Sequence, residues 1–254
     1  MQTLLERYRD GDCLNVWAEL RELGVISADD PKREDAWPVV AETMRRTRAN
    51  LEMLVERLSA EQYDFTDTTH PPIHIGSPLG TPNTQSVALR DWLDDLTGPL
   101  PMVLHCWMEF VGDVNLLGNH PDWPATEMYT DAMVVEFEYS ECKDSLNARE
   151  YHKNELEEWH YAVTEDGADE VGPFQIDFAP DVYHKVNVSG GGPYGIIVPD
   201  GSIDGRVDLD GTQMFFTDYI RHCFKWGGFP GFASHEKGRD NGTIARLSAD
   251  LLPV

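Results

Sequence analysis

The sequence predicts an α+β protein, in which an N-terminal helical segment precedes a small, largely antiparallel sheet flanked by helices. Three observations lead to this prediction. Apolar residues recur at helical spacing over residues 36–58, runs of β-branched and aromatic residues come later, between 132 and 199, and a further amphipathic segment closes the pattern at 215–224. Because the helices precede the strands instead of alternating with them, the pattern favours α+β over a doubly wound fold.

The first 65 residues are predicted to be helical. The apolar stripe of the 36–58 helix consists of Val40, Met44, Leu51, Leu54, Val55 and Leu58, with charged residues between them. A shorter helix is predicted upstream, over 14–23, and Gly24 is suited to end it because glycine accepts a positive φ without strain. We expect a helical hairpin or a small bundle here.

Residues 66–86 are rich in Pro, Gly, Thr and Ser and show neither helical nor strand periodicity, which indicates a loop or a domain boundary. The α+β region then extends over 87–254, either as a second domain or as part of one continuous domain. It begins with two predicted helices, 87–96 and 100–111, and Pro101 suits the first turn of the second helix.

Four strands are predicted after these helices. They cover residues 132–139, 159–165, 174–179 and 194–199, which are β-branched and aromatic runs bounded by turn residues. The polar segment 141–158 between the first two is either a connector or a short exposed helix.

Charge is the strongest compositional signal, with 45 acidic residues against 20 basic ones and a net charge of −25. Residues 1–60 carry 12 acids and 9 bases, so a net of −22 lies in the rest of the chain. Nucleic acid and anionic membranes should repel such a chain, whereas a basic protein should be attracted. Solubility is the plainer interpretation of the same charge.

No signal peptide and no run of roughly 18 apolar residues occurs, and the four cysteines, Cys13, Cys106, Cys142 and Cys223, are widely spaced. Each is typical of a buried thiol in a reducing compartment. The sequence therefore predicts a cytoplasmic protein.

Metal-binding motifs are absent from the sequence. His70 and His74 are four residues apart, but Pro71–Pro72 exclude the helix that would place them on one face. The dipeptides His105–Cys106 and His222–Cys223 direct adjacent side chains roughly 100° apart on a helix. We therefore predict no metal and no other cofactor.

Catalytic motifs are also absent: no GxSxG elbow occurs, and neither Ser189 nor any cysteine has the context of a nucleophile. The glycine turn in Asn187–Gly195 has the N–H groups to bind an anion, but a strand is predicted after it where a phosphate loop has a helix. We therefore assign no catalytic, cofactor-binding or metal-binding residue.

The segment "RHCFKWGGFPGF", residues 221–232, is dense in aromatic and reactive side chains. Its apolar residues continue a helical rhythm, and Gly227–Gly228 then turn the chain. We interpret it as core packing, with His222 and Lys225 on the polar side and Trp226 and Phe229 sealing the core.

The segment Gly98–Gly118 resembles the opening motif of the SUKH superfamily, which is related to a yeast cell-wall assembly regulator. The residues that fit are Leu100, Pro101, Leu104, Trp107, Phe110 and Gly112. The resemblance covers about residues 87–232, including the "WGGFPGF" ending, and departs from the pattern where "VGDVN" replaces an Asn–Gly turn. It implies an α+β domain that acts by binding, as in immunity proteins that neutralise a toxin.

The leading expectation is thus a non-enzymatic bacterial binding protein, and its more specific form is an immunity protein against a basic toxin. One alternative is an enzyme acting on a small polar substrate through scattered residues such as His184, Lys185 and the glycine turn. Another is a structural or regulatory subunit that oligomerises through the N-terminal helices.

Overall fold

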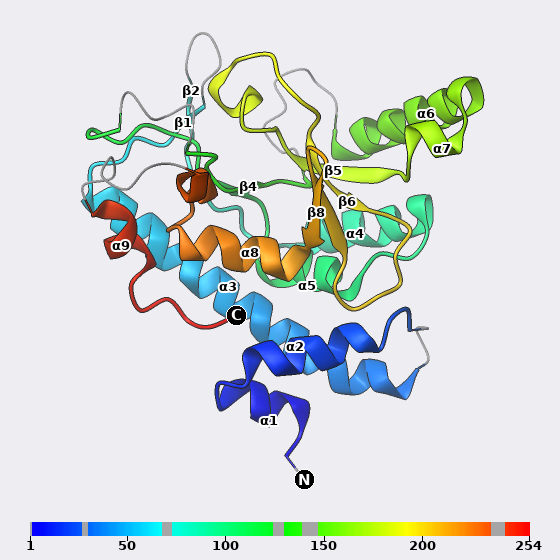
Figure 1. Ribbon diagram of the computed structural model, residues 1–254, viewed down its shortest axis with the longest axis horizontal. Helices are drawn as coiled ribbons and strands as arrows, with labels where there is room; N and C mark the ends of the chain where they lie inside the picture. The colour runs from blue at the N-terminus through cyan, green and yellow to red at the C-terminus, as the bar shows by residue number, and fades with distance from the viewer. Residues whose placement is uncertain (1, 27–29, 68–72, 124–129, 139–146, 235–241) are drawn as a thin grey trace.

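The computed structural model has the predicted α+β architecture (Figure 1). It describes residues 2–26, 30–67, 73–123, 130–138, 147–234 and 242–254, although not the side chains of residues 67, 73 and 74. None of the helices in these ranges is long and apolar enough to cross a membrane.

The N-terminal segment contains three helices, α1 (Leu4–Arg9), α2 (Cys13–Glu22) and α3 (Pro31–Ala60). The carboxylate of Asp30 accepts the backbone N–H of Lys32, and Pro31 lies in the first turn, so the sequence defines where α3 begins. The predicted stripe of α3 is inside the protein, with Met44, Leu51, Leu54 and Leu58 fully buried. The two predicted helices are confirmed, and α1 is an additional one.

Two helices and two short strand pairs follow α3. They are β1 (Thr66–Asp67) with β2 (Ile73–His74), α4 (Thr84–Thr97), α5 (Met102–Phe110), and β3 (Val114–Asn115) with β4 (Val134–Val135). Both helices were predicted. The strand predicted over 132–139 is shortened to β4, because the neighbouring backbone groups bond elsewhere: Met133 N–H to Gly228 and Glu136 N–H to Phe178. Tyr139 lies outside the described residues.

The main sheet is antiparallel, with the order β5 (Gln175–Ala179), β6 (Tyr194–Ile197), β7 (Arg206–Leu209) and β8 (Thr212–Phe215). The strands predicted over 174–179 and 194–199 are confirmed as β5 and β6. The hairpin of β7 and β8 was not predicted. It turns at Asp210 and Gly211, which both have a positive φ, and Asp–Gly is a hairpin signal that the sequence does contain.

The strand predicted over 159–165 is wrong. These residues belong to α6 (Ala148–Asp166), which α7 (Ala168–Val171) follows. Asn147 caps α6 by accepting the N–H of Glu150, and Trp159 packs on Phe174 with ring centroids 5.8 Å apart. The aromatic residues that suggested a strand thus occupy a helix that packs beside the sheet.

The chain closes with α8 (Phe216–Lys225), the 3₁₀ helix η3 (Pro230–Ser234) and α9 (Thr243–Ser248). Gly227 and Gly228 have positive φ after α8, and Phe229 is fully buried while Trp226 is partly buried against the core. One hydrophobic core contains residues of both the N-terminal helices and the sheet. The ion pair between Arg21 of α2 and Asp204, at 2.9 Å, also joins the two regions.

Candidate functional site

His184, Lys185 and the glycine turn are close in sequence, but the structure gives them different surroundings. His184 and Lys185 lie in the 3₁₀ helix η2 (His184–Val186), which follows β5. The side chain of His184 is 50% exposed, whereas that of Lys185 is 2% exposed. Only His184 of these two therefore has a side chain that a ligand could reach.

Lys185 belongs to a buried network. Its Nζ donates to Oδ1 of Asp131 at 2.5 Å and lies 4.5 Å from the ring centroid of Tyr194, whose hydroxyl donates to Asp131 at 3.3 Å. A buried ammonium that is paired with a carboxylate and a ring fixes the η2 segment to the sheet. The role of Lys185 in this arrangement is structural.

The glycine turn is also held by the protein itself. The N–H of Gly192 donates to Oδ1 of Asp210 at 3.2 Å, and Gly190 packs so closely on Tyr183 that a Cβ would collide with it. A carboxylate of the β7–β8 turn thus accepts an N–H that an anion would need. This contact agrees with the interpretation of Asn187–Gly195 as a turn.

His184 lines a hollow of about 320 Å³, which we call the His184 hollow. Segments far apart in the sequence form it: the end of β4, α6, β5, the start of η2 and the residue before β6. The lining residues are Glu136, Tyr151, Asp177, Phe178, Ala179, Pro180, Asp181, His184 and Pro193. The hollow therefore combines three carboxyl groups, an imidazole and a phenol with apolar walls.

Asp181 orients the imidazole of His184. Its Oδ2 accepts Nδ1 of His184 at 2.6 Å, and its Oδ1 accepts the backbone N–H groups of Tyr183 at 2.6 Å and His184 at 2.9 Å. Burial alone would raise the pKa of Asp181, but the hydrogen bonds from His184 and Tyr183 lower it below its usual value. An ionised carboxylate only accepts, so Nδ1 of His184 carries the proton and Nε2 is the ring nitrogen left for a ligand.

Asp177 is the most perturbed acid of the hollow. Burial and the charge of Glu155 raise its pKa to about 7, while a hydrogen bond from Tyr151 acts in the opposite direction. The alternation of β5 explains the position: Ile176 and Phe178 are buried in the core, so Asp177 lies on the opposite face of the strand, where Tyr151 of α6 also lines the hollow. Asp177 therefore titrates near neutral pH, as groups at functional sites often do.

The helices α6 and α7 form a second feature, which we call the acidic arm (residues 148–171). They lie at the edge of the molecule beside β5 (Figure 1). The arm carries eight acids and two bases, and seven of the eight acids are exposed. Tyr161 is 69% exposed on the same helix, and His152 is the one buried residue of α6. Such a helix presents a large negative face to solvent.

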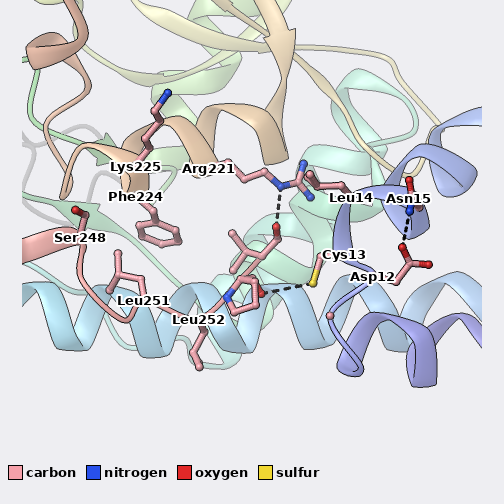
Figure 2. A pocket seen from close by; sticks show the side chains of 13 residues that line it. Asp12, Cys13, Leu14, Asn15, Arg221, Phe224, Lys225, Ser248, Leu251 and Leu252 are labelled. Atoms are coloured by element: carbon pink, nitrogen blue, oxygen red, sulfur yellow. Dashed lines mark hydrogen bonds between the residues drawn. The ribbon is translucent and has the colours of Figure 1, made fainter. Parts of the chain in front are cut away.

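A third feature is an open groove of about 730 Å³ beside the C-terminal segment (Figure 2). Arg221 of α8 reaches across it, where its Nε donates to the carbonyl of Val254 at 2.7 Å. Leu14 and Leu252 are exposed apolar residues of its lining. Three residues of the 221–232 segment, Arg221, Phe224 and Lys225, thus line this groove, in addition to the packing role expected for the segment.

Metal ligands and reactive thiols are not assembled in the described part of the chain. No group of three or more His, Cys, Asp or Glu side chains there is placed to hold a metal ion. Cys13, Cys106 and Cys223 are buried thiols, as predicted, and burial raises the pKa of Cys223 to about 12. Cys142, His70 and the side chain of His74 lie outside the described residues.

Sequence reasoning named His184 but not Asp177, Asp181 or Glu136. One local signal for Asp181 exists, because a carboxylate three residues before a histidine can accept both its ring and its backbone N–H. Asp177 and Glu136 carry no such signal, since only the fold brings them to His184.

Comparison of the chain with protein-family profiles, curated proteins and solved structures found no match in any of the three.

Proposed function

We propose that this chain is a non-enzymatic, cytoplasmic binding protein whose partner is a basic protein. In its most specific form, the proposal is an immunity protein of the SUKH type that neutralises a basic toxin, which is what the sequence resemblance over residues 87–232 implies. Neither nucleic acid nor a membrane is a partner under this proposal, because both are anionic.

The observation that carries the proposal is the acidic arm. Its exposed acids include Glu157, Glu158, Glu165 and Asp169, and the nearby base Lys153 pairs with Glu157 at 3.4 Å. With six more acids than bases, the arm creates a negative field at one edge of the molecule. Charge of this kind steers a basic partner and increases its association rate more than its final affinity.

An enzyme acting on a small polar substrate is the second candidate. The pair of Asp181 and His184 favours it, because an imidazole held by a buried carboxylate is the arrangement of a general base. No Ser, Thr or Cys is among the described residues that line the hollow, so the nucleophile would be water or one of its carboxylate, imidazole or phenol groups. We favour binding because the exposed acids of the arm support it directly.

The third candidate, oligomerisation through the N-terminal helices, has less support. The apolar stripe of α3 is occupied by the protein's own core, with Leu51 and Leu54 fully buried. The large apolar side chain that α2 exposes is Leu14, at the groove of Figure 2.

The experiment uses the basic protein encoded beside this chain's gene, purified and mixed with the chain at low and physiological salt. The proposal expects a complex on gel filtration, faster association at low salt and loss of the toxin's activity. Duplex DNA and RNA serve as controls and should not bind at either salt concentration. Absence of a complex, or of any basic neighbour, would contradict the immunity form, and binding to nucleic acid would contradict the electrostatic argument.

A further inference from the structure

We propose that the His184 hollow binds a primary ammonium group on an aliphatic stem, such as the side chain of a lysine. The inference rests on the proposed function in one respect: a lysine of the basic partner would be the natural source of that group. The hollow would then be a specific binding site for one lysine, in addition to the long-range attraction between the charges of the two proteins.

Hydrogen-bonding capacity is the first argument. Because Nδ1 of His184 donates to Asp181, Nε2 of a neutral imidazole accepts. Asp177 and Glu136 add carboxylate oxygens to the lining of the same hollow. An ammonium group has three donors and no acceptor, which matches a hollow rich in acceptors.

The charge of the hollow is the second argument. Among its described lining residues are three carboxyl groups but no Lys or Arg. The raised pKa of Asp177 means that ionising this carboxyl group costs free energy, because the group is buried and because the charge of Glu155 repels it. A bound cation would favour the ionised form and would be attracted in return.

Gln175, on the same face of β5 as Asp177, adds a buried acceptor close to Asp177 without lining the hollow. Oε1 of Gln175 is buried and has no hydrogen-bond partner among the described residues. This atom and Oδ1 of Asp177 lie 2.7 and 3.3 Å from the point that a Cβ on Gly195 would occupy. Glycine at position 195 therefore leaves room for both of these side-chain oxygens close to β6.

The walls decide in favour of an ammonium on a stem over a compact cation. Ala179, Pro180 and Pro193 are apolar, and Tyr151 adds an aromatic side chain to the lining. The methylene groups of a lysine bury apolar surface while the charged end keeps polar partners. A volume of about 320 Å³ is near the lower end of the range for small-ligand pockets and suits one long side chain.

The test is a titration of the ¹⁵N-labelled full chain with n-butylammonium chloride, which mimics the lysine side chain. It is run at pH 8 and constant ionic strength, and the ring signals of His184 are followed by long-range ¹H–¹⁵N NMR. The proposal expects saturable shifts of these signals. The neutral mimic n-butanol should cause none, and methylguanidinium should bind more weakly than n-butylammonium.

Three variants make the test specific. Asp177→Asn and Glu136→Gln should each weaken n-butylammonium binding about tenfold, because each removes a charge-assisted hydrogen bond. Glu56→Gln removes an exposed acid of α3 that belongs neither to the hollow nor to the acidic arm, and should leave binding unchanged. Thermal unfolding of each variant confirms that it is folded.

The proposal is overturned if the His184 signals do not saturate, if n-butanol has the same effect, or if Asp177→Asn binds as well as the unmodified chain. Should the basic partner still bind while n-butylammonium does not, the hollow is excluded and the proposed function stands. Failure of both would reject both.

Discussion

Carboxylates behave differently in two regions of this molecule. In the N-terminal helical region, hydrogen bonds from arginines lower the pKa of the acids: Arg7 acts on Asp12 and Glu19, and Arg9 acts on Glu42. Around the strands, burial has the opposite effect and raises the pKa of Asp113 and Asp177 to about 7.

The difference follows from charge balance. The first 60 residues have three bases for every four acids, whereas the remainder has one base for every three acids. Acids of the first region are therefore engaged in pairs that fix helices to one another, as Arg9 of α1 does with Glu42 of α3 at 3.0 Å. The negative charge of the second region is largely left for the solvent or for a partner, and this is where the acidic arm and the His184 hollow lie.

The largest expected effect concerns the ion pair that joins the two regions. Arg21→Ala should lower the free energy of unfolding by about 3–5 kcal/mol, because it leaves the fully buried Asp204 without its cation. Urea unfolding measures the change. The matched control is Arg9→Ala, in which a 57% exposed arginine leaves Glu42, and there the loss should stay below about 1 kcal/mol. Equal losses in the two variants would contradict the comparison.

Asp177→Asn should have a smaller effect of the opposite sign. Burial raises the pKa of Asp177 in the folded protein to about 7, against an ordinary value of 3.8, so ionisation costs stability as the pH rises through this interval. The variant should therefore be more stable at pH 8 by about 1–3 kcal/mol, and equal to the unmodified chain near pH 4. Thermal unfolding at the two pH values tests this, and a destabilised variant at pH 8 would show that the carboxylate is needed for the fold.

The smallest expected effect concerns the surface of the arm. Lys153→Ala removes the exposed i, i+4 pair with Glu157 and should cost at most about 0.5 kcal/mol. A loss of several kcal/mol would mean that the arm's charges are engaged in the fold and not left for a partner.

Helices with a clear apolar period, such as α3 and α8, were predictable from the sequence, because the apolar residues that repeat at helical spacing are the ones that pack into the core. The error over 159–165 arose because aromatic content suggested a strand, although the pair of Lys153 and Glu157 at i, i+4 and the cap at Asn147 were local helix signals. The β7–β8 hairpin was likewise missed, although the sequence contains its turn signal, Asp210–Gly211.

The candidate site was less accessible to sequence reasoning for a physical reason. His184 comes with a local partner, Asp181, but Glu136 and Tyr151 lie tens of residues earlier in the chain and reach the hollow only through strand pairing and helix packing. Asp177 is close to His184 in sequence, but nothing in the local sequence places it in the hollow. The burial that raises the pKa of Asp177 is a property of the fold, and the spacing of residues in the sequence does not predict it.

The most direct test of the central claim is the association rate of a short, fluorescein-labelled lysine-rich peptide, measured by stopped flow at about 30 and about 150 mM sodium chloride. Two quadruple variants are compared. One converts Glu157, Glu158, Glu165 and Asp169 of the arm to their amides, and the other does the same to Glu34, Asp35, Glu52 and Glu56, which are exposed acids of α3.

We predict that the unmodified chain associates faster at the lower salt concentration. The arm variant should be slower by about tenfold there and lose most of its salt dependence, while the α3 variant should change much less. Equal slowing in both variants, or a rate that does not depend on salt in the unmodified chain, would contradict the claim that the unbalanced charge of the strand-bearing region is what attracts a partner.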